Sequence, residues 1–154
     1  MRRIFLSIVL AIILVLSMLL LTGCDGGLSV TGVAFEWTNA PPDATSQIYT
    51  TNVKSGEDIK QTLNNTLDNM PKEITKLPLE NVIITIAQTK NPDTYIMNTI
   101  SNSTGEFIGG KIVAPYKFQI RVKATKEGSQ EVYKDITHDT ISHVIVILLV
   151  KNKN

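Results

Sequence analysis

Seven short stretches of the chain have the alternating apolar and polar residues of β-strands, and turn-forming residues separate them. The most regular stretch runs from Tyr116 to Thr125, where every second side chain is apolar and the intervening side chains are polar or charged. A period of two places each set on its own face of a strand, so one face can be buried. The other six predicted strands are residues 28–37, 82–87, 94–101, 107–113, 132–137 and 144–150. Strands with a turn about every eight to twelve residues are typical of an antiparallel β-sandwich.

A segment with a different pattern, residues 41–76, separates the first two predicted strands. Ser55 and Asp58 have the spacing of a helix capping box, and Pro71 ends the pattern that follows. The apolar positions between them form one narrow stripe on a helix: Ile59, Leu63, Leu67 and Met70. Residues 43–52 show no sustained periodicity. We therefore predict one helix, over residues 56–70, that packs onto its own domain.

A resemblance to a known family rests on turns and apolar positions in residues 78–82, 102–107, 116–122 and 126–128 and in the final strand. These motifs are similar to those of the carboxypeptidase regulatory-like family, and Val30-Thr31-Gly32-Val33 resembles its opening strand. Ser129 departs from the family, which has an aromatic residue after the glycine. The resemblance implies an all-β, seven-stranded antiparallel Ig/transthyretin-like β-sandwich over residues 29–150, in which residues 41–76 are an insertion. It also implies an accessory or binding module without catalysis. The chain then ends in a polar tail, residues 151–154.

The first 23 residues have the pattern of an export signal. Arg2 and Arg3 precede an apolar run that ends at Leu21 and spans about 27 Å at helical rise, so an uncleaved membrane anchor is the alternative. The run leads into Leu21-Thr22-Gly23-Cys24, which resembles the bacterial lipoprotein processing box. This resemblance implies a signal peptide over residues 1–23, lipid on Cys24 and a short tether over residues 24–28. Two or three acyl chains on Cys24 would hold the protein firmly at the membrane.

Composition narrows the possible functions. Without Arg2 and Arg3, which belong to the leader, 13 basic residues stand against 14 acidic ones, so no nucleic-acid partner is expected. The only cysteine is Cys24, which excludes an intrachain disulfide framework. Stability must therefore come from an ordinary apolar core.

Few residues in this sequence are candidates for catalysis or metal binding. His138 and His143 are the only histidines, with Asp135 and Asp139 near them, and a zinc site needs about three protein ligands with a second shell. We therefore predict no metal, no cofactor and no enzymatic activity, and a small hydrolase that uses His138 or His143 is the alternative. The transthyretin-like hydroxyisourate hydrolases end in Tyr-Arg-Gly-Ser, whereas this chain ends in Lys-Asn-Lys-Asn.

Three surfaces are candidates for a partner. Lys117, Arg121, Lys123 and Lys126 form a basic row that could meet anionic polymers, unless acidic residues on the neighbouring strand neutralise it. Trp37 and Tyr49 could stack on a sugar ring, although a single tryptophan in an apolar strand is more often part of the core. The helix over residues 56–70 could dock into an envelope complex.

Together these patterns predict a lipid-anchored protein at the cell membrane, facing outside the cytoplasm. Its predicted role is non-catalytic binding, adhesion or scaffolding, with an envelope protein or a glycan as partner.

Overall fold

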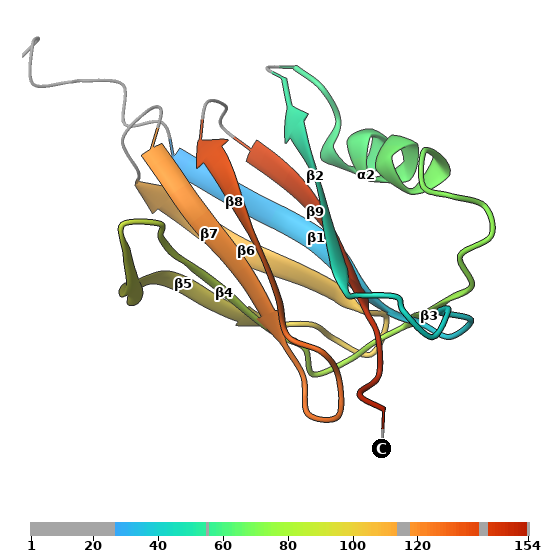
Figure 1. Cartoon of the computed structure of the whole chain (residues 1–154). Coiled ribbons are helices and arrows are strands. Elements are labelled where there is room, and N and C mark those ends of the chain that lie inside the picture. The colour runs from blue at the N-terminus through green and yellow to red at the C-terminus, as the bar shows by residue number, and fades with distance from the viewer. Residues whose placement is uncertain (1–26, 55, 114–117, 139–141, 154) are drawn as a thin grey trace, which may run out of the picture.

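β1 (Gly27–Trp37) is the strand around which the first sheet is built (Figure 1). The computed structural model of the chain describes residues 27–54, 56–113, 118–138 and 142–153. The strand order is β2-β9-β1, and β3 and β6 pair with successive parts of the other edge of β1. The other strands of this sheet are β2 (Gln47–Val53), β3 (Lys76–Pro78), β6 (Glu106–Val113) and β9 (Ser142–Leu149).

The second sheet packs against one face of the first and has the strand order β5-β4-β7-β8. Within this sheet, each strand is antiparallel to its neighbours. Its strands are β4 (Ile83–Gln88), β5 (Asn91–Ile100), β7 (Phe118–Thr125) and β8 (Val132–His138). An all-β, two-sheet sandwich is therefore confirmed.

The strand count and the strand directions differ from the prediction. The described residues contain nine strands rather than seven, because β2 lies within the insertion 41–76 and the short strand β3 begins at its last residue. The sandwich is not fully antiparallel, since β1 and β9 pair in parallel from Ser29 to Glu36. β2 gave no periodic signal because only Ile48 and Val53 in it are buried, so its sequence lacks a regular apolar face.

The core consists of two apolar layers, one on each face of the first sheet. Between the sheets, Ile145, Ile147 and Leu149 of β9 pack among buried residues of both sheets. On the opposite face, Val146 and Leu148 pack with Val33, Met70 and Ile74 and with apolar residues of the helix. β9 is a central strand that is buried on both faces, which explains its unbroken apolar sequence.

The helix, α2 (Ile59–Asp68), lies on the outer face of the first sheet against β2 and β9 (Figure 1). Its N-cap is Asp58, whose carboxylate accepts hydrogen bonds from the Lys60 and Gln61 amides at 2.7 and 3.4 Å. The predicted capping box is therefore wrong, because Asp58 itself is the N-cap; Ser55 lies outside the described residues. The helix is shorter than the predicted 56–70 and ends before Pro71, with Asn69 as its C-cap.

The polar tail is attached to the sandwich rather than free. Lys151 forms a bridge with Ser129 and an ion pair with Glu36 at 2.8 Å. The Asn152 amide donates to the Gly128 carbonyl at 2.8 Å. The chain therefore stays bound to the end of the sandwich at which β1 finishes.

Candidate functional site

The predicted lipidation site, Cys24, lies outside the described residues, as do the leader 1–23 and the processing box Leu21, Thr22 and Gly23. The described part begins at Gly27, three residues after Cys24, and Gly27 is already paired with Val113 in the first sheet. Among the described residues, no helix is long and apolar enough to cross a membrane.

The two histidines lie in different sheets. His138 ends β8 in the second sheet, and His143 is the second residue of β9 in the first sheet. His143 is only 1% exposed, so a hydrolase could not use it without opening the sandwich. The structure does not describe Asp139 or the side chain of His138. No group of three His, Cys, Asp or Glu side chains that could hold a metal occurs in the described part of the chain.

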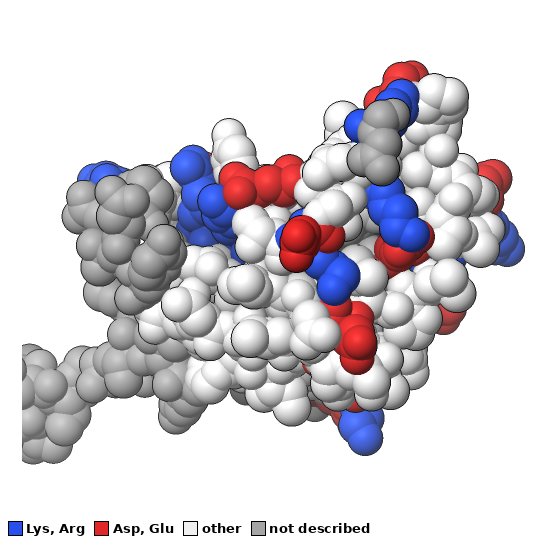
Figure 2. All heavy atoms as spheres, turned by 90° about the horizontal axis from the view of Figure 1, so that it is seen from below, with Lys and Arg blue, Asp and Glu red and all other residues white. Residues whose placement is uncertain are grey.

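Two residues of the basic row pair with acidic residues on or next to the neighbouring strand. Arg121 lies opposite Asp135 in the β7–β8 register, and its Nε and Nη2 donate to the two carboxylate oxygens at 2.7 and 2.8 Å. Lys123 pairs with Glu131 at 2.8 Å. Lys126 donates to the Glu80 carbonyl at 2.8 Å, and Lys117 lies outside the described residues. Figure 2 shows acidic and basic side chains interleaved on one end of the molecule. The charges of Arg121 and Lys123 are therefore partly compensated within the protein.

The Arg121–Asp135 pair makes stability depend on pH in a defined direction. Hydrogen bonds from Arg121, together with its charge, lower the pKa of the Asp135 carboxyl despite some desolvation. Because the pKa of Asp135 is lower in the folded than in the unfolded protein, the pair stabilises the fold at a pH above the unfolded-state pKa. This stabilisation is lost as the pH falls through the folded-state pKa. We expect Asp135→Asn to lower the urea midpoint slightly at pH 7, with a difference from wild type that shrinks as the solution is acidified.

The control for this prediction is Glu127→Gln, at an exposed carboxylate with no ion pair among the described residues. Its urea midpoint should follow that of the wild-type protein at each pH. A constant deficit of Asp135→Asn down to pH 2 would show that the pair contributes packing and not charge.

Trp37 and Tyr49 line the same hollow, which has a volume of about 320 Å³. The Trp37 indole N–H donates to Asn39 Oδ1 at 3.0 Å, and this oxygen also accepts from the Thr75 amide at 2.8 Å. Asn39 Nδ2 donates to the Glu73 carbonyl at 2.6 Å. Asn39 thus ties the end of β1 to the segment before β3 and fixes the indole at the mouth of the hollow. Both aromatic rings are partly buried against the second core layer, so each has a structural role as well as an accessible edge.

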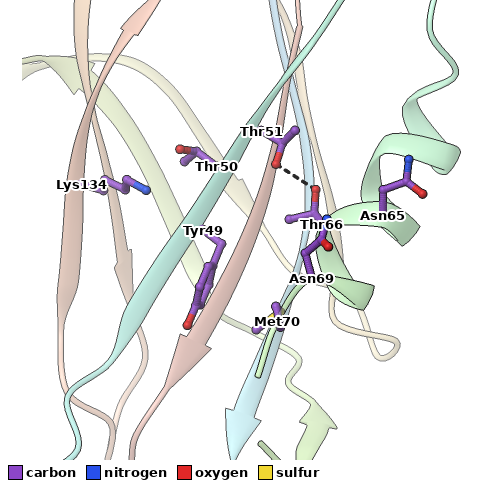
Figure 3. Close-up of a pocket in the computed structure, with 8 residues that line it drawn as sticks. All are labelled: Tyr49, Thr50, Thr51, Asn65, Thr66, Asn69, Met70 and Lys134. Atoms are coloured by element: carbon purple, nitrogen blue, oxygen red, sulfur yellow. Dashed lines mark hydrogen bonds between the residues drawn. The ribbon is translucent and has the colours of Figure 1, made fainter. Parts of the chain in front are cut away.

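Two more hollows adjoin the first along β2. The middle one has a volume of about 250 Å³ and shares Tyr49 with the first (Figure 3). The third has a volume of about 360 Å³ and shares Thr51 and Asn65 with the middle one. We call the three together the α2–β2 groove.

The helix wall of this groove carries three amide side chains. Gln61, Asn65 and Asn69 are four residues apart, a spacing that places them in one row along a helix. None of these side chains makes a hydrogen bond within the described part of the chain. The neighbouring row, Thr62 and Thr66, is buried. This row of amides is visible as a spacing in the sequence, but the sequence does not show that it faces a groove.

One hydrogen bond fixes the distance between the walls of the groove. The Thr66 hydroxyl is hydrogen-bonded to the Thr51 hydroxyl of β2 at 2.9 Å and donates to the Thr62 carbonyl at 2.7 Å (Figure 3). On the far side of β2, Lys134 donates to the Ile48 carbonyl at 3.1 Å. The middle hollow is therefore lined mainly by hydroxyl and amide groups, its two walls are joined by the Thr51–Thr66 hydrogen bond, and Lys134 is its one charged lining residue.

The helix does not offer a free apolar stripe to a partner. Leu63, Leu67 and Met70 pack on the first sheet in the second core layer. A partner that docked on α2 would meet its polar side chains instead.

No known family model matches this chain, and no curated protein matches its sequence.

Proposed function

We propose that the chain is an exported lipoprotein that lipid on Cys24 holds at the outer side of a cell membrane. Its sandwich then acts as a non-catalytic binding, adhesion or scaffolding module. The observation that carries this proposal is the short distance in sequence between Cys24 and the fold, because β1 is already paired at Gly27. A tether of three residues spans at most about 10 Å, so the start of β1 would lie next to the membrane.

The α2–β2 groove supports a binding role for the other end of β1. β1 has 11 residues, which at the rise of a strand separates Gly27 from Trp37 by roughly 33 Å. Trp37 and its hollow would then be displayed away from the membrane. The hydrogen-bonding groups in the groove suit recognition, and the burial of His143 and the pairing of Asp135 leave these two residues poor candidates for catalysis.

We also propose that the sandwich is an Ig/transthyretin-like domain of the carboxypeptidase regulatory-like kind. Support comes from the seven predicted strands, each of which overlaps a strand of the structure. The turn at residues 102–105 has the expected glycine, with Gly105 at a φ of 78°. β2, β3 and the parallel β1–β9 pair would then be additions to that plan.

Mass analysis of the full chain, expressed in a bacterium that processes lipoproteins, tests the proposed anchor. The wild-type protein should lack residues 1–23 and should carry the mass of a diacylglyceryl group. Cys24→Ala should keep its leader and should take up no labelled palmitate, because the thiol is the acceptor for the lipid. The matched control is Asp25→Ala, at the next residue, which should be acylated like the wild type. A wild-type protein with Met1 present and an unmodified sulfur would show that the leader is an uncleaved anchor instead.

A further inference from the structure

We propose that the α2–β2 groove binds an extended, uncharged oligosaccharide. The proposal rests on the binding role proposed above and names the class of ligand for that site. Three features of the groove lead to it: a row of unused amides, an aromatic end and a rigid spacing of the walls.

The unused amides match the hydrogen-bonding pattern of sugars. Each side chain of Gln61, Asn65 and Asn69 can donate and accept at once, and each sugar hydroxyl can do the same. The amides are exposed and make no hydrogen bond within the part of the chain that the structure describes, so they are available to a ligand. Asn39 shows the contrast, because its amide oxygen accepts from Trp37 and Thr75 and its amide nitrogen donates to the Glu73 carbonyl.

The aromatic end supplies the apolar contact that a sugar ring also needs. Trp37 and Tyr49 line the first hollow together with Gln47 and Glu73. The Tyr49 hydroxyl donates to Gln47 Oε1, and the Glu73 carboxylate is exposed with no partner among the described residues. The C–H face of a ring could pack on the aromatic side chains while the Glu73 carboxylate accepts from its hydroxyls.

The rigid spacing favours a sugar chain over a peptide strand. A peptide that extended the first sheet would need the outer carbonyl groups of β2, and Lys134 already occupies the Ile48 carbonyl. The Thr51–Thr66 hydrogen bond joins helix and strand before a ligand arrives, so a sugar chain would lie along the outside of this contact on walls already in place, which lowers the entropic cost of binding. The groove follows β2, whose seven residues span about 20 Å, so an extended chain of several rings would fit along it.

The only tryptophan of the chain reports directly on this site. We would titrate the full-length protein, held in a zwitterionic detergent without a sugar headgroup, with maltohexaose, cellohexaose and chitohexaose. At least one of these neutral hexasaccharides should give a saturable change in Trp37 fluorescence, and calorimetry should give the same dissociation constant. A galacturonate hexamer and a hexapeptide of serine and threonine complete the panel.

The double variant Asn65→Ala, Asn69→Ala should weaken binding of that hexasaccharide by about tenfold or more, because two hydrogen-bonding side chains are lost. Asn64→Ala, on an exposed face of the same helix, should keep the wild-type affinity. If the double variant has a lower urea midpoint than the wild type, Gln61→Ala replaces it and should weaken binding by a few fold.

Three results would overturn the inference: no neutral hexasaccharide binds, binding is unchanged in the amide variants, or the hexapeptide binds in an amide-dependent way instead. Failure of the lipoprotein proposal has a separate signature. An unacylated chain that still binds a hexasaccharide would contradict the lipid anchor and support the groove as a binding site. An acylated chain that binds no hexasaccharide would support the anchor and contradict the binding site.

Discussion

Substitution of Gly32 by alanine is expected to destabilise the sandwich by about 3 kcal/mol, the upper end of the range for overpacking a core. A Cβ at this position would lie 2.0 Å from the Ile145 carbonyl oxygen and 2.5 Å from the ring of Phe107. Neither group can move easily, because Ile145 belongs to the central strand β9 and Phe107 is 2% exposed in the core between the sheets. The clash would therefore separate β1 from β9, the parallel pair at the centre of the first sheet.

Urea unfolding of Gly32→Ala and Gly110→Ala gives a matched comparison. Gly110 lies in β6 of the same sheet, and a Cβ built there meets nothing within 4 Å. Gly110→Ala should therefore unfold at or slightly above the urea concentration of the wild type, because a glycine in a strand has an entropic cost in folding. Equal stability of the two variants would mean that β1 and β9 are not packed as described.

Substitution of Leu148 by alanine is expected to cost about 3 kcal/mol, as for other leucines truncated in a filled core. Leu148 is fully buried and lies in the layer between the first sheet and α2, together with Val33, Val146 and Met70. Since the helix is tied to β2 through Thr66 and Thr51, it has limited freedom to collapse into the space left behind. The cavity should therefore persist and add to the lost burial.

The control is Ile108→Ala, at an apolar residue of the same sheet that is 73% exposed. It should change the free energy of unfolding by less than about 0.5 kcal/mol. A Leu148→Ala variant as stable as Ile108→Ala would show that α2 does not cover β9 in solution.

The Leu148 experiment also tests whether the insertion belongs to the fold, because Met70 and Ile74 of the insertion pack in the same layer. Residues 41–76 form β2, which is an edge of the first sheet, and α2, which covers the outer face of that sheet. Deletion of residues 55–70 would expose Val33, Val146 and Leu148, so it should unfold or aggregate the protein. The groove is thus built on a segment that the core requires, which keeps its walls in place.

Most of the strands could be predicted from the sequence, because their signal is local. In β7, buried Ile120, Val122 and Ala124 alternate with outward polar residues, and this period of two is visible without any partner strand. The apolar run 144–150 was likewise predictable as a buried strand. The spacing of Leu63 and Leu67 predicted the helix for the same reason.

Features that depend on a partner strand were not predictable. β2 is a strand because it pairs with β9 from Gln47 to Val53, and its own sequence has no regular apolar face. The parallel direction of β1 and β9 and the pairing of Arg121 with Asp135 depend on register between segments far apart in sequence.

Part of the candidate site could likewise be predicted from the sequence, and part depends on the tertiary structure. The sequence alone indicated Cys24 as a lipid acceptor and Trp37 and Tyr49 as possible stacking residues, because each is recognised from its type and its immediate neighbours. Only the tertiary structure brought Trp37 and Tyr49 to one hollow and placed Gln61, Asn65 and Asn69 along the hollows beside β2. Local patterns determine which residues form an element, whereas burial of two apolar faces on one central strand decides which elements meet and which polar groups are left between them.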